Sequence, residues 1–285
     1  MFVDTKLAAR IERAEVWLTR AVTNAASALG RVPGAFVREL GDGGVASYLR
    51  PGSPMNKLIG AGLGAPLEPA LLASIEHEQR ERCETTRVEL CSLASVEALA
   101  FFAERGYRLA GFENVLVRTL AQPATPGDDT NIVCPLVTTE PMRSIWQETT
   151  VAAVAHPDET GVVLDQLSRE SIEEVISDVL ELSAFERYLA LWNGEPAGAA
   201  SLLIHEGVAM LGGSATLPAY RRRGVQAALT RARLESARQQ GADIAVVTTA
   251  PGSQSQANVM RRGFALAYSR AILMLEPERA GARHL

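Results

Sequence analysis

The chain carries the same residue pattern twice, once in each half. Residues 35–45 lie over residues 187–197 without a gap, turn upon turn. Farther along, residues 72–107 lie over residues 229–264, so that the Gly-Tyr pair closing the first segment falls on a Gly-Phe pair in the second. The register returns after a single gap, which leaves the first copy five residues shorter. This predicts two similar domains in tandem; the alternative is a chance similarity between two unrelated α/β segments.

The second copy predicts the element order β-β-β-α-β-α-β. Alternating and apolar runs separated by Asn-Gly and Glu-Gly turns indicate an antiparallel meander, and three- and four-residue apolar spacings indicate helices. The strands are expected at 188–192, 197–205, from 208, at 244–248 and at 264–275, with one helix ending at Gly241 and another running from Ser253 or Ser255 to Gly263.

The loop before the first of these helices contains three consecutive arginines. Residues 208–229 read VAMLGGSATLPAYRRRGVQAAL, which is an apolar run, a proline turn, the arginines, one glycine and a helical pattern. A loop that opens directly into a helix leaves backbone N–H groups at the positive end of the helix dipole, where a phosphate binds. The stretch therefore predicts a pyrophosphate site. The alternative is a solvated arginine run that caps a surface helix.

Two motifs of the second copy resemble those of the GNAT superfamily of acetyltransferases. Arg221-x-x-Gly224-x-Gln226-Ala227 resembles the signature Arg/Gln-x-x-Gly-x-Gly/Ala, and the segment from Asn258 to Gly263-Phe264 resembles the Asn…Gly-Phe ending of that family. Gln226 departs from the pattern, so Ala227 is expected to supply the close approach to the phosphate.

The resemblance implies a fold, a co-substrate and a set of binding residues. The fold is α/β with a mixed sheet: two tandem GNAT-like domains, each a mostly antiparallel sheet flanked by helices. The co-substrate is acetyl-CoA, with no metal. The resemblance implies that backbone groups of Ala215 and Leu217 bind the pantetheine arm, that Asn258 meets the same arm, and that the pyrophosphate is bound by the amides of Arg222, Arg223, Gly224, Val225, Gln226 and Ala227.

The first copy lacks the arginine-rich loop. Between Gly60 and Leu72 the chain has no arginine, one carboxylate at Glu68, and two prolines that remove amide donors. Such a loop is poorly suited to a pyrophosphate, so only the C-terminal copy is expected to keep the acetyl-CoA site.

Length and composition agree with two domains. The chain has 285 residues and 47% hydrophobic content, enough for two cores. A stretch rich in proline and small polar residues suggests a division into domain 1–120, linker 121–131 and domain 132–285. Amphipathic helices are expected at 4–29, 142–156 and 171–182. In the family the last two line the acceptor pocket, so the loop 156–163 is a candidate wall.

Charge and cysteine content exclude several classes of protein. A net charge of −5 is unlike that of a nucleic-acid-binding protein. The three cysteines form no CxxC pair, so neither a disulfide framework nor a zinc site is expected. No long uncharged apolar run indicates a signal peptide or a membrane span. We expect a cytoplasmic protein without a membrane partner, and a homodimer stays open.

The resemblance implies direct transfer of the acetyl group to the amine of a small molecule or peptide, but the catalytic residues stay unassigned. The family commonly places a tyrosine acid where this chain has Val259; Tyr220 and Tyr268 lie outside that position. Candidate bases are His205, Glu206 and Ser214, although polar residues are ordinary at a hairpin turn. Two alternatives remain: a non-catalytic acyl-CoA-binding or regulatory protein, which fits the missing tyrosine, and a scaffold that binds no coenzyme.

Overall fold

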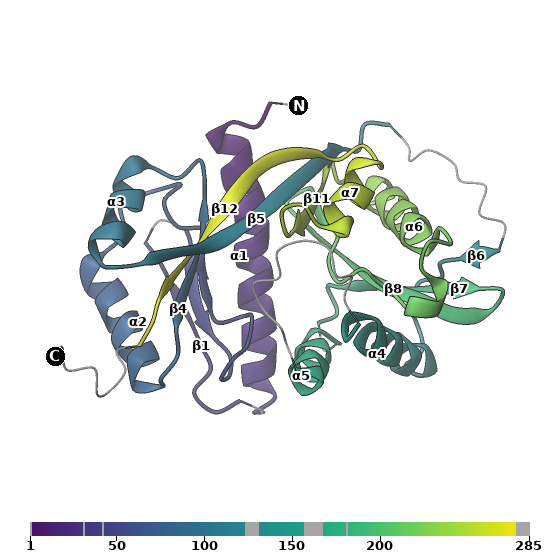
Figure 1. The fold of residues 1–285 in the computed structure, drawn as a ribbon, viewed down its shortest axis with the longest axis horizontal. Helices are drawn as coiled ribbons and strands as arrows, with labels where there is room; N and C mark the ends of the chain where they lie inside the picture. Colours follow the sequence, from purple (N-terminus) through teal and green to yellow (C-terminus); the bar gives the residue numbers. More distant parts are fainter. Residues whose placement is uncertain are drawn as a thin grey trace. The chain divides into compact units, whose positions relative to one another are not determined.

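The chain divides into two compact units that do not follow the order of the sequence. The computed structural model describes residues 2–30, 32–41, 43–122, 131–156, 168–180 and 182–277. One unit, called here the N-unit, contains Phe2–Glu113 and the chain from Tyr268 onward. The other, the C-unit, contains Asn114–Ala267. Figure 1 shows the elements of both.

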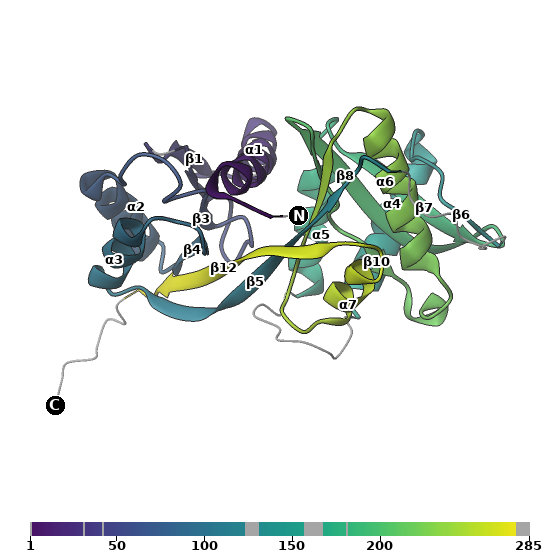
Figure 2. The ribbon, with the colours of Figure 1, turned by 90° about the horizontal axis from the view of Figure 1, so that it is seen from above.

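The N-unit is a sheet with helices on both faces. Its strands follow the order β1-β2-β3-β4-β12, in which β3 and β4 are parallel and the other neighbours are antiparallel. Helix α1 covers one face and helices α2 and α3 the other (Figure 2). The elements are α1 (Thr5–Ala28), β1 (Phe36–Glu39), β2 (Val45–Tyr48), β3 (Lys57–Ile59), α2 (Pro69–Glu81), β4 (Thr86–Cys91), α3 (Val96–Glu104) and β12 (Ala265–Leu275).

Sequence periodicity explains why α1 forms and which face it buries. The Asp4 side chain accepts a hydrogen bond from the N–H of Leu7 (2.8 Å) and so caps the first turn. Ile11, Ala14 and Val22 follow at spacings of three or more and are buried. The predicted helix at 4–29 is therefore confirmed with its cap.

The C-unit is a second mixed sheet. Its strands follow the order β5-β11-β9-β8-β7-β6, with β10 on β8; β9 and β11 are parallel. Helix α6 lies on one face of β8, and α4 and α5 lie on the other (Figure 1). The elements are β5 (Arg108–Thr119), β6 (Ile132–Val133), α4 (Glu140–Val154), α5 (Arg169–Leu180), β7 (Glu186–Trp192), β8 (Glu195–His205), β9 (Val208–Met210), β10 (Ala215–Thr216), the 3₁₀ turn η1 (Pro218–Tyr220), α6 (Val225–Gln239), β11 (Ile244–Thr249) and α7 (Gln254–Met260).

Most element predictions match these bounds to within about two residues. The helices expected at 142–156 and 171–182 are α4 and α5, and Ser253 caps α7 through the N–H of Gln256. In each half, the helix after the third strand is followed by a strand, a short helix and a long strand, as the repeat predicts.

The last strand of each repeat completes the sheet that contains the other repeat. Strand β5 ends the first repeat, yet its Asn114–Thr119 half pairs antiparallel with β11 in the C-unit. Strand β12 ends the second repeat, yet Arg270–Leu275 pairs antiparallel with β4 in the N-unit. The predicted boundaries of 1–120, 121–131 and 132–285 differ from these units for that reason. Residues 123–130 of the predicted linker lie outside the described residues.

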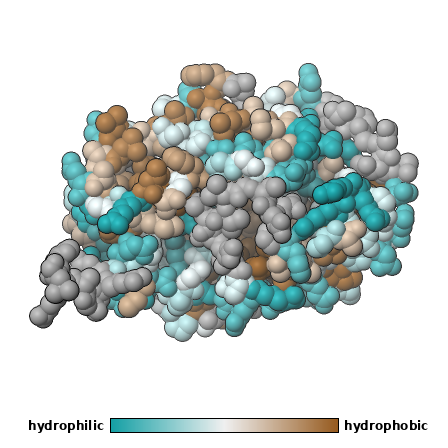
Figure 3. Space-filling view, viewed as in Figure 1, coloured by the Kyte–Doolittle hydropathy of each residue, from teal (hydrophilic) through white to brown (hydrophobic). Residues whose placement is uncertain are grey.

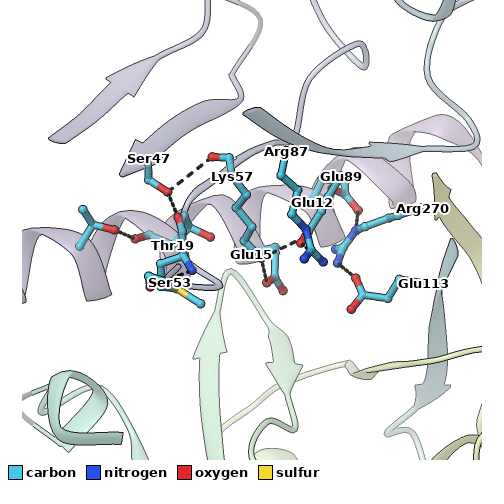
Figure 4. A network of polar contacts seen from close by, with 12 residues as sticks. Glu12, Glu15, Thr19, Ser47, Ser53, Lys57, Arg87, Glu89, Glu113 and Arg270 are labelled. Atoms are coloured by element: carbon cyan, nitrogen blue, oxygen red, sulfur yellow. Dashed lines mark hydrogen bonds and ion pairs between the residues drawn. The ribbon is translucent and has the colours of Figure 1, made fainter. Parts of the chain in front are cut away.

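A buried polar network holds β12 in the N-unit (Figure 4). One oxygen of Glu12 in α1 accepts hydrogen bonds from the Tyr268 hydroxyl (2.6 Å) and from Nε of Arg270 (2.9 Å). Arg270 also pairs with Glu113 (3.2 Å). Beside them, the Lys57 ammonium pairs with Glu89 (3.0 Å) and Glu15 (3.4 Å), as listed by the same network. Glu12 and Arg270 are each 1% exposed, so their charges must compensate each other.

Replacing Arg270 by methionine should therefore strongly destabilise the N-unit. The change leaves the buried Glu12 carboxylate without its cation, which typically costs about 3–5 kcal/mol. Urea unfolding of the full chain measures the loss. Arg20→Ala is the control, because the Arg20–Glu39 pair is exposed and should contribute less than about 1 kcal/mol. Equal losses in the two variants would contradict the anchoring role of Arg270.

The same network predicts a pH dependence that Glu113 controls. Burial, and secondly the charge of Glu89, raises the pKa of the Glu113 carboxyl to about 7. The folded chain then keeps a proton there that the unfolded chain loses near pH ~4.3, so this residue makes stability fall as pH rises through that window. Unfolding free energies of the wild type and Glu113→Gln, compared at pH 5 and pH 8, should favour the variant more at the higher pH. A constant difference would contradict this.

Candidate functional site

Strand β9 parts from β11 in the middle of the C-unit sheet. The last backbone bond between them runs from the Leu211 N–H to the Val246 carbonyl (2.9 Å). The chain then turns toward β8, where Ala215 pairs with Ala199. Beyond Val246, no described strand pairs with the β9-facing edge of β11, while its other edge continues along β5 as far as Thr249. An open edge of this kind can take an extended ligand through backbone hydrogen bonds.

The segment Gly212–Ser214 borders this opening and is exposed. The Gly212 carbonyl faces the protein, where it accepts hydrogen bonds from the backbone N–H of Ser201 (3.1 Å), the Ser201 hydroxyl (3.2 Å) and Arg233 (3.2 Å). The N–H groups of Gly213 and Ser214 donate to no described group. This segment therefore presents free donors on the side of the opening.

The arginine-rich loop ends in an uncapped helix N-terminus. Gly224 is the N-cap of α6 with a φ of 85°, and no side chain caps the helix there. The first helical bond is from the Ala228 N–H to the Gly224 carbonyl (2.9 Å), so the N–H groups of Val225, Gln226 and Ala227 have no partner within the helix. Arg222 also has a positive φ, 63°. Free N–H groups at a dipole's positive end, without a competing side chain, suit an anion.

The three loop arginines have different surroundings. Arg221 donates to the His156 carbonyl at the end of α4. The Arg223 guanidinium lies 5.4 Å from the Trp192 ring centre and 5.9 Å from that of Tyr220. Arg222 is exposed. The bland alternative of a wholly solvated arginine run therefore does not describe Arg221 or Arg223.

Gly198 in β8 lets the two parts of the site approach each other. A Cβ added there would lie 2.8 Å from the Ala215 carbonyl oxygen and 2.8 Å from Cγ1 of Val225. Sequence reasoning missed this residue, because a glycine within a strand pattern does not reveal what approaches it.

The residues considered for acid–base chemistry are scattered. Val259 is buried in the core, so the position of the family's tyrosine contributes no acid. Tyr220 lies in η1 beside Arg223. Tyr268 belongs to the N-unit, where it bonds Glu12, because β12 leaves the C-unit at that residue.

The candidate bases divide in the same way. His205 and Glu206 lie at the turn before β9, whereas the opening follows the end of β9. From Gly198 to His205, β8 is extended over about 23 Å at roughly 3.3 Å per residue. Ser214 lies in the exposed segment itself.

The remaining predicted residues lie around the opening or outside the described chain. Ala215 and Leu217 follow the exposed segment, and the Leu217 N–H bonds the Ala197 carbonyl (3.0 Å). The side-chain oxygen of Asn258 in α7 accepts from Gln254 (2.9 Å) and Arg261 (2.8 Å). Of the loop 156–163, only His156 lies within the described residues.

The corresponding place in the N-unit is closed by its own chain. After β3, the Gly62 carbonyl accepts from the Ser95 N–H (2.9 Å) next to β4. A Cβ at Gly62 would lie 2.7 Å from that of Ala98 and 3.0 Å from that of Ala94. Helix α2 begins with Pro69 after Glu68, whose carboxylate makes no cap bond. This start offers a negative charge and one N–H fewer, which disfavours a phosphate.

Two further findings concern only the described part of the chain. No three histidine, cysteine or acidic side chains there come together as a metal site would require. None of the described helices is both long and apolar enough to cross a bilayer. In Figure 3 apolar side chains gather on the left of the view, and exposed apolar residues of the N-unit include Val96, Leu99, Leu109 and Phe112.

Gly198→Ala tests whether close approach at β8 shapes this site. The added methyl would push the Ala215 carbonyl and the start of α6 apart, at a cost of about 1–3 kcal/mol in stability. Thermal unfolding measures the loss. Gly41→Ala is the control, since nothing lies within 4 Å of its added Cβ. A shift no larger than that of the control would contradict the close packing.

Comparison with known proteins places the C-unit in a family. The model of the acetyltransferase (GNAT) family matches residues 144–264. No curated protein matches the sequence.

Solved structures extend the likeness in fold to nearly the whole chain. A GCN5-related N-acetyltransferase from Kribbella flavida has a TM-score of 0.66 at 19% identity, with 96% of each chain covered. A tandem GNAT protein from the clavulanic acid biosynthesis pathway has a TM-score of 0.59 at 14% identity, covering 88% of this chain and 86% of its own. At these identities the likeness shows the fold alone, which is that of two tandem GNAT-like domains. Residues 144–264, which contain the loop, α6 and the open strand edge, form a domain of the acetyltransferase (GNAT) family.

Proposed function

We propose that the chain is an N-acetyltransferase that moves an acetyl group from acetyl-CoA to an amine, with one coenzyme site, in the C-unit. The observation that carries the proposal is the pairing of two features in the family-matched domain. One is the uncapped N-terminus of α6 at Gly224, and the other is the opening where β9 parts from β11. The first suits a pyrophosphate and the second suits an extended amide-containing arm.

The residues present fit such a coenzyme in three places. The amides of Arg222, Arg223, Gly224, Val225, Gln226 and Ala227 would hold the pyrophosphate, as the resemblance implied. Backbone groups of Ala215 and Leu217 would hold the pantetheine arm along the open edge of β11, with Asn258 beside it. Gln226 is half-buried and Ala227 is buried, in keeping with a close approach through the alanine.

The chain's own groups can orient and stabilise, and the structure favours catalysis by positioning. Acetyl-CoA supplies an acyl group activated as a thioester. The free N–H groups of Gly213 and Ser214 would donate to an oxygen that gains negative charge during attack by the amine. With Val259 in the acid position, we assign no general acid; holding a deprotonated amine in line needs little proton transfer from a side chain.

A non-catalytic acyl-CoA-binding protein is the second candidate, and the buried Val259 is the observation that favours it. Both candidates predict coenzyme binding. They differ in turnover, so release of free thiol from acetyl-CoA in the presence of small amines and peptides decides between them.

The decisive variant is Gly224→Val. A β-branched residue is strained at a φ of 85° and would reshape the loop, so coenzyme affinity and thiol release should fall at least about tenfold. Gly241→Val is the matched control at the other end of α6, with a φ of 81° and open space around it. It should lose comparable stability yet bind acetyl-CoA as the wild type does. Unchanged binding by Gly224→Val would overturn the proposed site.

A further inference from the structure

Arg233 in α6 is a buried cation with an unusual set of partners. Its side chain is 2% exposed. Within the described residues it pairs with no carboxylate; its hydrogen bonds go to the backbone carbonyls of Leu229 (3.1 Å), Ser201 (3.1 Å) and Gly212 (3.2 Å). Burial lowers the pKa of this guanidinium to about 10, so it remains protonated at neutral pH. An unpaired buried charge is costly, and an apolar side chain would fill the same space at lower cost.

The three carbonyls belong to three different parts of the site. Leu229 is on α6, whose N-terminus is the proposed pyrophosphate site. Ser201 is on β8, and Gly212 begins the exposed segment beside the open edge of β11. One rigid planar group therefore fixes the helix and the exposed segment relative to the same strand.

The bond to Gly212 also sets a direction. In a trans peptide the carbonyl and the following N–H point in opposite directions. Because the Gly212 carbonyl points inward to Ser201 and Arg233, the N–H of Gly213 points outward, on the side of the opening. A carbonyl that donates electron density to a cation also makes the N–H of its own peptide a stronger donor.

We propose that Arg233 is the positioning residue of the coenzyme site: it holds the Gly212 carbonyl away from β11, and so keeps the opening and the outward N–H of Gly213 in place. This inference rests on the proposed function. It adds a requirement that the loop motif does not contain, because Arg233 lies two turns into α6 and touches no part of the loop itself.

The test compares two buried arginines of the C-unit. Arg187 is 5% exposed and, like Arg233, bonds only carbonyls in the contacts resolved for it, those of Phe185, Val179, Leu180 and Leu182. These lie at the end of α5 and before β7, away from Gly212 along the chain. Arg233→Met and Arg187→Met should therefore both lose stability, but only the first should lose coenzyme affinity.

Binding of coenzyme A to the full chain by isothermal titration is the main readout. Arg233→Met should raise the Kd at least tenfold, Arg233→Lys should recover part of that loss by restoring a donor and a charge, and Arg187→Met should change it less than twofold. Amide hydrogen exchange without coenzyme is the second readout: residues 211–217 should exchange faster in Arg233→Met than in Arg187→Met. Ser201→Ala, which removes one of the three donors to Gly212, serves if Arg233→Met fails to fold; the loss of one hydrogen bond should raise the Kd about two- to tenfold.

The outcomes separate the inference from the proposed function. If the wild type binds coenzyme A and Arg233→Met or Ser201→Ala binds it equally well, the inference is overturned and the proposed function stands. Equal losses in Arg233→Met and Arg187→Met would also overturn it, since general destabilisation would then explain both. If the wild type itself binds no coenzyme A, the proposed function is wrong and the inference falls with it.

Discussion

The exchange of terminal strands is the constraint on which both halves of the structure depend. Strand β4 is completed by the last strand of the chain, and β11 by a strand from the middle of it. Neither sheet is complete without residues from the other repeat, because a buried strand edge without a partner leaves backbone groups unsatisfied. The buried bonds of Glu12 to Tyr268 and Arg270 fix one end of this arrangement. The repeats are therefore two copies in sequence, but neither copy alone corresponds to a folded unit.

The same comparison explains why one unit carries a site and the other a closed seam. Both have a pair of parallel strands that part at one end. In the C-unit the chain turns to β8 and its carbonyl is drawn inward by Ser201 and Arg233, which leaves the edge of β11 open. In the N-unit the Gly62 carbonyl bonds Ser95, and small side chains fill the space. Helix α6 then begins with free amides beside arginines, whereas α2 begins with Pro69 beside Glu68.

Much of the fold and the position of the loop could be predicted from the sequence, because these depend on local signals. Apolar spacing located α1, Ser253 marked the start of α7, and Gly224 at the end of the arginine run marked the start of α6. What could not be predicted depends on partners far away in the chain. Strands β5 and β12 have similar patterns, so nothing local says which sheet each one joins, and Tyr268 was therefore associated with the wrong unit. The roles of Gly198 and Arg233 depend in the same way on what packs against them; a buried arginine on α6 looks in sequence like another exposed one.

The most direct test of the central claim is the stoichiometry of acetyl-CoA binding to the purified full chain, measured by isothermal titration. The account predicts about one site per chain, since only the C-unit combines a free helix N-terminus with an open strand edge. Two sites would contradict the closed seam of the N-unit. No binding would contradict the coenzyme site itself and leave a protein that uses its GNAT domain for another purpose.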